Sequence, residues 1–431
     1  MKIIKITLSL IFFIGTTLIL FLQIDDDINP EAQQAYEQVT APTESKAYIF
    51  YLGLYASTDD QPEVIGEKVY KSIQEMQKSD VLDQTNKPSY TYPEENKLAQ
   101  FTLNSKNEIY AEKIFSQTFN SATLSKEQQV LLKRYKRFMA FDDFHTLAKP
   151  GLNNPLDGYW YLTSGNDLLL LHAIDIAKKG EFSEAKKSIL ENINQTRVQL
   201  KNADNLIGRA IFKRILANNL DVLSSLIHQY KIPFKAKIAT LTTEEKDVTA
   251  SLNREFSMRY IFYKSLDRSR NFLANDSSKI QVPSWVNRIF FKPNMSINNI
   301  YSEYKRFIDL SFLQPEEFAK AAENSIQSIK NQSNFRNYFG SVLHSIGLPN
   351  FNDYSARSFY LDSKITLFNQ TANQLTLPNK LGSIQNPFYK DKVAFYNDDK
   401  SQICFEGPLP DKVKQGYRCL SVEAKVSRDI K

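Results

Sequence analysis

The stretch SGNDLLLLHAIDIAKKGEFSEAKKSILENINQTRVQL, residues 164–200, decides the fold class of this chain. Ser164 followed by Asp167 has the pattern of a helix start, and the apolar residues after it surround a helix almost completely. Gly180 predicts the end of this helix, because glycine adopts the left-handed conformation found just after helix ends. Apolar residues then recur at spacings of three and four, which predicts a second helix. The stretch therefore predicts a central pair of helices.

Helix signals continue on both sides of this pair. The predicted starts and caps are Ser125 with Gln128, Asp204, Thr242 with Glu245 for a helix to about Arg270, and Pro315. Glycine supplies only 13 of 431 residues, which disfavours glycine-rich nucleotide loops and glycine-punctuated barrels. With 42% apolar residues the chain is not a disordered one. We expect a mainly α protein with a multi-helix body of helical hairpins.

The segment 169–193 resembles one helical hairpin of the tetratricopeptide type. The matching positions are Leu169, Ala173, Ile176, Gly180, Phe182, Ala185 and Ile189. The segment departs from that pattern at Asn192, where a small apolar residue is usual, and no second copy follows at the 34-residue period. A generic antiparallel helix pair would show much the same pattern, so both interpretations stay open.

The N-terminus carries a long apolar run. Residues 6–24 contain no charged side chain, and at ~1.5 Å of rise per residue they make a helix of roughly 28 Å, close to the thickness of the bilayer core. The run leads directly into three aspartates without a small-residue cleavage site or a cysteine. This favours an uncleaved anchor over a signal peptide or a lipoprotein. Lys2 and Lys5 precede the run, so the positive-inside rule places the rest of the chain outside the cytoplasm.

We therefore expect four segments. These are a transmembrane signal anchor (1–24), a juxtamembrane linker (25–45), a helical body (46–375) and a C-terminal cap (376–431). A single pass through a bacterial inner membrane, with the body in the periplasm, is the simplest arrangement that fits this order.

The C-terminal cap contains the two cysteines of the sequence, Cys404 and Cys419. An oxidising compartment would let them pair, and closing a loop of this size contributes about 3 kcal/mol in the chain-entropy model. Two free thiols in a reducing compartment are the alternative. Residues 393–396 and 402–405 flank a polar turn, which predicts a β-hairpin. We expect a small hairpin held by a disulfide.

Three short motifs resemble uncharacterised membrane-anchored proteins of the bacterial cell envelope. They are YIFYLGLY at 48–55, the turn Asn386-Pro387-Phe388, and Phe405-Glu406-Gly407-Pro408. This resemblance implies an envelope location and no activity.

The sequence contains no recognisable catalytic or cofactor motif. Its four histidines are His145, His172, His228 and His344, and none has the spacing of a zinc site. The most enzyme-like cluster is Asp142, Asp143 and His145, which could support acid–base chemistry on a glycan. The simpler interpretation is a helix end whose acids pair with basic residues one or two turns earlier. We predict no catalytic residue, no cofactor and no metal site.

The most informative charge pattern lies between residues 254 and 310. Ten basic and five acidic residues give this segment a net charge of +5, against +6 for the whole chain, and aromatic residues are interleaved with them. The candidate binding residues are Arg254, Arg259, Arg268, Arg270, Trp285, Arg288, Phe290, Phe291 and Lys292. This pattern predicts contact with a membrane surface or an acidic protein, whereas nucleic acid is not expected outside the cytoplasm. Core aromatics beneath a solvated basic face would give the same composition.

Together these features predict a non-enzymatic, membrane-anchored binding or scaffold protein of the bacterial envelope. Its helical hairpins would present a groove or a face to another envelope protein. Two alternatives remain: an immunity protein against an envelope-targeting toxin, and an envelope enzyme that acts on glycan or lipid through Asp142, Asp143 and His145.

Overall fold

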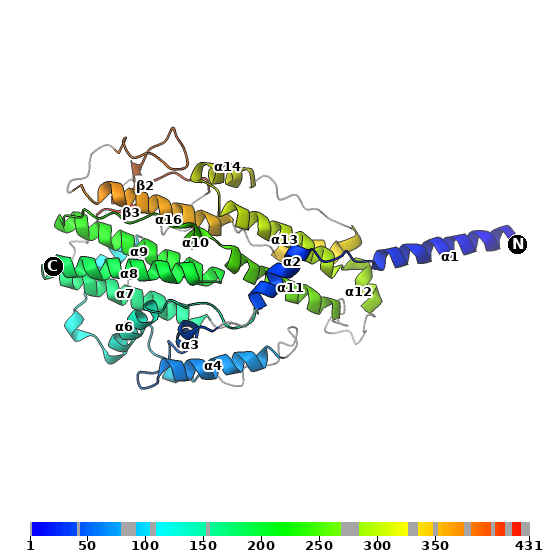
Figure 1. The fold of residues 1–431 in the computed structure, drawn as a ribbon, viewed down its shortest axis with the longest axis horizontal. Coiled ribbons are helices and arrows are strands. Elements are labelled where there is room, and N and C mark those ends of the chain that lie inside the picture. The colour runs from blue at the N-terminus through cyan, green and yellow to red at the C-terminus, as the bar shows by residue number, and fades with distance from the viewer. Residues whose placement is uncertain are drawn as a thin grey trace.

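The computed structural model describes residues 2–40, 44–78, 92–103, 109–151, 156–268, 284–325, 335–347, 352–374, 381–397, 401–409 and 416–423. Over these residues the protein is mainly α-helical, as the sequence predicts, with a small antiparallel sheet near the C-terminus. The helix α1 (Lys2–Gln23) projects from one end of an elongated helical body (Figure 1).

The predicted central pair is formed by α7 (Asp157–Lys178) and α8 (Phe182–Asn202), which pack against each other. Gly180 has a φ of 89°, so it ends α7 in the left-handed conformation as expected. The predicted start at Ser164 is wrong. Ser164 lies inside α7, where its hydroxyl donates to the carbonyl of Phe101 at 2.7 Å. The true start has no side-chain cap at Leu156, so it leaves no cap pattern in the sequence.

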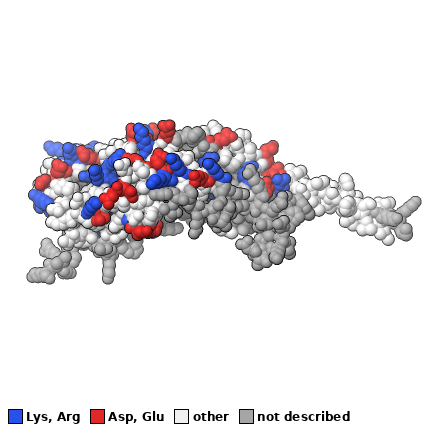
Figure 2. All heavy atoms as spheres, turned by 90° about the horizontal axis from the view of Figure 1, so that it is seen from below, with Lys and Arg blue, Asp and Glu red and all other residues white. Residues whose placement is uncertain are grey.

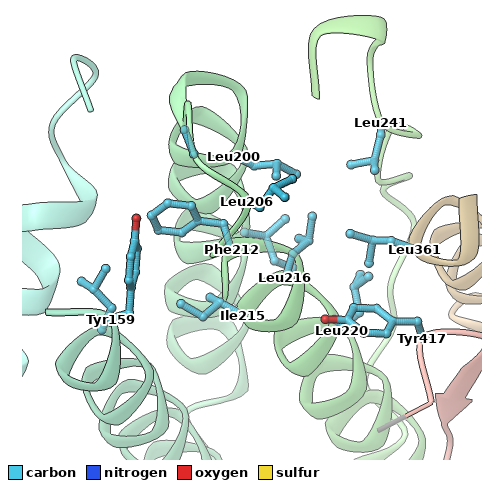
Figure 3. Close-up of a cluster of buried hydrophobic side chains, with 14 of the residues drawn as sticks. Tyr159, Leu200, Leu206, Phe212, Ile215, Leu216, Leu220, Leu241, Leu361 and Tyr417 are labelled. Atoms are coloured by element: carbon cyan, nitrogen blue, oxygen red, sulfur yellow. The ribbon is translucent and has the colours of Figure 1, made fainter. Parts of the chain in front are cut away.

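Two further helices complete the centre of the body. α6 (Lys126–Met139) begins with the predicted capping box of Ser125 and Gln128 and packs against α7. α9 (Leu206–Tyr230) packs against α7 and α8, and its apolar side chains reach toward α16 and the C-terminal segment around Tyr417 (Figure 3). Its N-cap is Asn205, whose side chain accepts from the Gly208 amide at 2.7 Å, and not the neighbouring Asp204.

A buried amide cluster joins these four helices. The Tyr135 hydroxyl donates to the Asn192 side chain at 2.9 Å, and the Asn192 amide donates to both Asn166 and Asn219 at 2.9 Å. Buried polar groups need such partners to offset the loss of water. The asparagine that departs from the tetratricopeptide pattern is therefore the centre of this hydrogen-bonded cluster.

The hairpin of α3 (Lys46–Leu52) and α4 (Pro62–Met76) lies against this centre. The two helices approach so closely that a Cβ on Gly66 would collide with the Ile49 carbonyl, and one on Gly53 with the Pro62 carbonyl. The YIFYLGLY segment forms α3 and the turn after it, and its residues are buried. Glycine is therefore required at these two positions by close backbone contact.

The helix predicted from Thr242 to about Arg270 is interrupted. Thr242 and Glu245 do form a capping box, but α10 (Thr243–Lys246) lasts only one turn. Asp247 then accepts from the Thr249 amide at 2.8 Å, which starts α11 (Thr249–Arg268) as a new helix. Asp247 therefore forms a second, local cap, and side-chain hydrogen bonds of this kind compete with continuation of a helix.

The remaining helical elements complete the body. They are α2 (Pro30–Thr40), η1 (Glu94–Asn96), α5 (Tyr110–Phe115), η2 (Ser121–Thr123), α12 (Ser284–Phe290), α13 (Pro293–Leu310), α14 (Pro315–Ser325), η3 (Phe335–Asn337), α15 (Tyr338–Gly347) and α16 (Asn352–Thr371). α14 begins at Pro315 as predicted. Within the segment expected to be a linker, Pro30–Thr40 is helical. Here α2 packs against α11 and α13, and the ring of Tyr36 stacks on Tyr260 at 4.2 Å.

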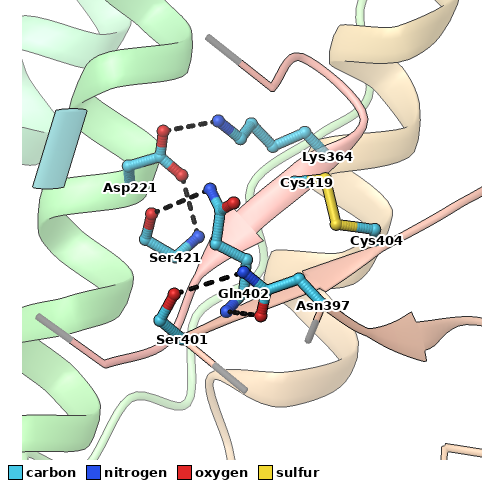
Figure 4. The surroundings of a disulfide bond; sticks show 8 residues. All are labelled: Asp221, Lys364, Asn397, Ser401, Gln402, Cys404, Cys419 and Ser421. Carbon is cyan, nitrogen blue, oxygen red and sulfur yellow. Dashed lines mark hydrogen bonds and ion pairs between the residues drawn. A yellow bond between two sulfur atoms is a disulfide. The ribbon is translucent and has the colours of Figure 1, made fainter. Parts of the chain in front are cut away.

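The predicted hairpin is present and gains a third strand. β1 (Phe395–Tyr396), β2 (Gln402–Cys404) and β3 (Cys419–Ser421) pair antiparallel in this order. Cys404 and Cys419 face each other across β2 and β3 and form the predicted disulfide. Figure 4 shows how the sheet is attached to the helices: the Asp221 carboxylate of α9 accepts from the Ser421 amide at 2.9 Å and from the Lys364 ammonium of α16 at 2.6 Å.

Candidate functional site

Three of the nine predicted binding residues are interior residues. Arg254, Phe291 and Lys292 are buried, so they cannot form part of a surface patch in this conformation. The Arg254 guanidinium donates to the carbonyls of Thr146 and Ala148 and lies 3.6 Å from the Asp204 carboxylate. Arg254 therefore holds the loop after α6 against α9 and α11.

Lys292 connects the elements at the end of the body nearest α1. Its ammonium donates to the carbonyls of Arg288 and Ile289 at the C-terminal end of α12. Its amide donates to the Asn337 side chain at 2.8 Å, and the Asn337 amide group donates to the Ser296 hydroxyl at 2.9 Å. Burial lowers the pKa of Lys292. This residue therefore has a structural role, tying α12 and η3 to α13.

The other predicted residues are distributed differently. Arg259 is half-buried, whereas Arg288 and Phe290 are exposed on α12, where Arg288 pairs with Asp267 at 3.3 Å. The side chains of Arg268 and Trp285, and the whole of Arg270, lie outside the described residues. The segment 254–310 thus contains buried residues that make interior contacts and exposed residues on α12.

The enzyme-like cluster is occupied by structural hydrogen bonds. The Asp143 carboxylate accepts from the Lys46 amide at 2.6 Å and from the Ala47 amide at 3.1 Å, so it caps the start of α3. The His145 amide donates to Ser45, and the Asp142 carbonyl accepts from Asn202. The expected pairing of these acids with the basic residues of α6 is not found among the described residues. Asp143 makes a long-range cap that sequence spacing could not reveal.

Burial keeps the other histidines uncharged at neutral pH. Desolvation lowers the pKa of His172 and of His344, and it lowers the pKa of His228 to about 4. Within the described ranges, no group of three or more His, Cys, Asp or Glu side chains is placed to hold a metal ion. We therefore interpret these histidines as structural residues of the folded core.

A cleft of about 450 Å³ opens between α3, α4 and the end of α6. Its lining residues are Glu44, Ser45, Lys46, Ile49, Glu63, Glu67, Tyr70, Arg137, Phe141 and Leu147. The apolar members form a floor and the charged members form a rim, which is the usual arrangement of a site that accepts a side chain from a partner. Asp143 and the two close-packed glycines of the α3–α4 hairpin fix the walls of this cleft.

The charge of the rim is acidic. Arg137 forms an ion pair with Glu63 and lies over the Phe50 ring at 5.0 Å, so its charge is already engaged. Glu44 and Glu67 are exposed and make no ion pair with any described residue, while Lys46 supplies one nearby cation. The rim therefore favours a ligand that carries a positive charge beside an apolar group.

Sequence reasoning missed this cleft, although it left a signal. Glu63, Glu67 and Tyr70 follow each other at i, i+4 and i+7, so they share one face of α4. The residues that line the cleft together with this face of α4 include Lys46 and Phe141, which are far apart in the chain. Comparison with known proteins finds no matching family model, no matching curated protein and no matching solved structure.

Proposed function

We propose that this chain is a non-enzymatic binding protein, anchored by α1 in the bacterial inner membrane with its body in the periplasm. Support for the anchor comes from Ile6–Gln23, which is long and apolar enough to cross a membrane and has no residue buried in the body. Residues 6–23 contain no charged side chain, and Figure 2 shows them as a white extension of the charged body.

The observation that carries the proposed binding role is the cleft of α3, α4 and α6. Its floor of Ile49, Tyr70, Phe141 and Leu147 offers apolar contact, and Glu44 and Glu67 on its rim offer negative charge. The partner that fits is an envelope protein with an exposed segment in which an apolar side chain lies next to Lys or Arg. Burial of the apolar side chain supplies affinity, and the acidic rim supplies orientation.

Site-specific photocrosslinking in growing bacteria tests this role. A photoreactive phenylalanine at position 70 or 141, in the cleft, is expected to capture one discrete envelope protein, which mass spectrometry then identifies. The same residue at position 198, which is exposed on α8, is the matched control and is expected to capture none. Glu67→Lys is expected to reduce capture several-fold, because it reverses the charge of the rim.

Equal capture at positions 70 and 198, or capture that Glu67→Lys leaves unchanged, would contradict the cleft as the binding site. The immunity version of the proposal predicts in addition that the captured protein is a toxin from another cell. In that case a strain lacking this protein becomes sensitive to the toxin, and Glu67→Lys fails to restore resistance.

A further inference from the structure

The end of the body from which α1 leaves is built by α12, η3 and α15. α12 lies beside the base of α1 and contacts it directly (Figure 1). Both η3 and α15 contact α12. The Phe290 ring of α12 lies 6.1 Å from the Phe339 ring of α15, edge to face. These short elements therefore form one continuous structure beside the base of the anchor helix.

This structure exposes large apolar side chains. Phe290 is 42% exposed, Phe335 73%, Tyr338 53% and Ile346 78%, and we call these four residues the basal surface. Tyr338 and Ile346 lie in the first and last turns of α15, whereas Phe339 and Leu343 pack against the core. α15 carries no acidic, lysine or arginine side chain, and burial lowers the pKa of His344, its one basic side chain.

The end of the basal surface that η3 forms lies at the level where the apolar span ends. The Arg336 guanidinium donates to the Ile24 carbonyl at 3.1 Å and lies over the Phe21 ring at 5.2 Å. Arg336 directly follows Phe335 in η3, so η3 is held at the last turn of α1. A helix that crosses the bilayer would therefore bring the basal surface to the depth of the lipid headgroups.

Two of the three aspartates after α1 contact the body through their carboxylates, whereas the Asp27 side chain is exposed. The Asp25 carboxylate accepts from the amides of Asn294 and Met295 at 2.8 and 3.1 Å, at the N-terminus of α13. The Asp26 carboxylate lies 3.6 Å from the Arg336 guanidinium. These contacts offset negative charge that would otherwise oppose approach to anionic lipid.

We propose that the basal surface is seated in the headgroup region of the same bilayer that α1 crosses, so that the body is held at a fixed orientation rather than on a loose tether. Aromatic rings beside Arg288 and Arg336 are the side chains that favour this depth, where apolar contact and lipid phosphates are both available. The inference rests on α1 crossing the membrane, which is part of the proposed function.

Fluorescence quenching in reconstituted full-length protein tests the seating. The two native cysteines are joined in the disulfide, so a single introduced cysteine can carry the label. Labels at Phe335→Cys and Ile346→Cys are compared with Val198→Cys on α8 and with Leu10→Cys within α1. The vesicles contain phosphatidylethanolamine and phosphatidylglycerol, with a nitroxide near the headgroups of a fraction of the lipids.

The expected result is quenching several-fold stronger at positions 335 and 346 than at position 198. Quenching at 335 and 346 as weak as at 198, with strong quenching of Leu10→Cys by a nitroxide deep in the acyl chains, would overturn the seating and leave the anchor intact. Absence of deep quenching at Leu10→Cys would overturn the anchor itself, and the seating with it.

Discussion

Large apolar side chains are mostly buried in the helices α7–α9 and exposed on the basal surface. Along α9 the large apolar residues from Phe212 to Ile227 are buried, and the buried amides around Asn192 are hydrogen-bonded to one another. At the base, Phe335 and Ile346 belong to short elements that pack well on one side and remain exposed on the other. The centre is complete by itself, whereas the base has an apolar face that remains exposed among the described residues.

This difference indicates that the base, and not the centre, forms a contact surface for something outside the protein. A large apolar residue left exposed in isolation is common, but a group of them beside a helix suited to a bilayer indicates a contact surface. Substitutions should therefore affect folding in the centre and membrane contact at the base. The following predictions test this division, from the largest expected effect on stability to the smallest.

Lys364→Ala should be strongly destabilising, because it leaves the Asp221 carboxylate buried without its cation. The two side chains are 0% and 4% exposed, and their ion pair ties α9, α16 and β3 together. Removal of one partner of such a pair costs about 3–5 kcal/mol. Chemical denaturation followed by circular dichroism measures the free energy of unfolding.

The matched control is the double variant Lys364→Met with Asp221→Asn, which removes both charges and keeps an acceptor for the Ser421 amide. We expect it to recover much of the lost stability, since no uncompensated charge stays buried. A single variant as stable as the natural protein would show that the centre does not depend on this contact.

Gly66→Ala should damage the hairpin that forms the cleft. The new Cβ would meet the backbone carbonyl of Ile49, which no change of rotamer can avoid, so we expect a cost of about 1–3 kcal/mol. Gly382→Ala is the control, because no atom lies near its added Cβ, and we expect a change within about 0.5 kcal/mol. Loss of photocrosslinking at position 70 in Gly66→Ala alone would connect the close helix packing to the binding site.

His228 should make the centre sensitive to acid. Its pKa is lowered by burial from 6.5 to about 4 in the folded protein, so the unfolded chain binds the proton more readily. The stabilisation from the neutral side chain is therefore present above pH 6.5 and is lost as the pH falls toward 4. We expect the natural protein to lose about 1–2 kcal/mol more than His228→Gln between pH 7 and pH 4, a value reduced for partial solvent exposure. Parallel curves for the two proteins would contradict this assignment.

Ile346→Ser should hardly change stability, within about 0.5 kcal/mol, because the side chain is exposed. Ile365→Ser is the matched substitution in the centre, where the same side chain is fully buried on α16, and we expect it to cost about 3–5 kcal/mol. Urea unfolding of both variants in one mild detergent gives the comparison. Similar losses for the two variants would show that the base folds as part of the core.

Much of the fold was predictable because its signals are local. The capping box at Ser125, the terminator at Gly180 and the proline start at Pro315 all depend on residues close together in sequence. The errors lie where a distant partner decides the structure. Asp204 looks like an N-cap, but Thr146 and Arg254 occupy its carboxylate, so the adjacent Asn205 caps α9 instead.

The site was less predictable than the fold for the same reason. Arg254 and Lys292 were predicted to be binding residues, but both are buried and their long side chains donate to interior carbonyls. The residues of the cleft come from three helices, and the basal surface joins Phe290 to residues of η3 and α15. Composition along one segment cannot report surfaces assembled from separate segments.

Thiol accessibility in bacterial spheroplasts tests most directly whether the body lies outside the inner membrane with its base in the lipid. A membrane-impermeant maleimide is added to cells that carry Glu67→Cys at the cleft or Ile346→Cys at the base. The expected result is rapid labelling of Glu67→Cys in spheroplasts but not in inverted vesicles, and labelling of Ile346→Cys only after denaturation. Equal labelling of both positions in spheroplasts would contradict the seated base, and labelling of Glu67→Cys only in inverted vesicles would contradict the periplasmic body.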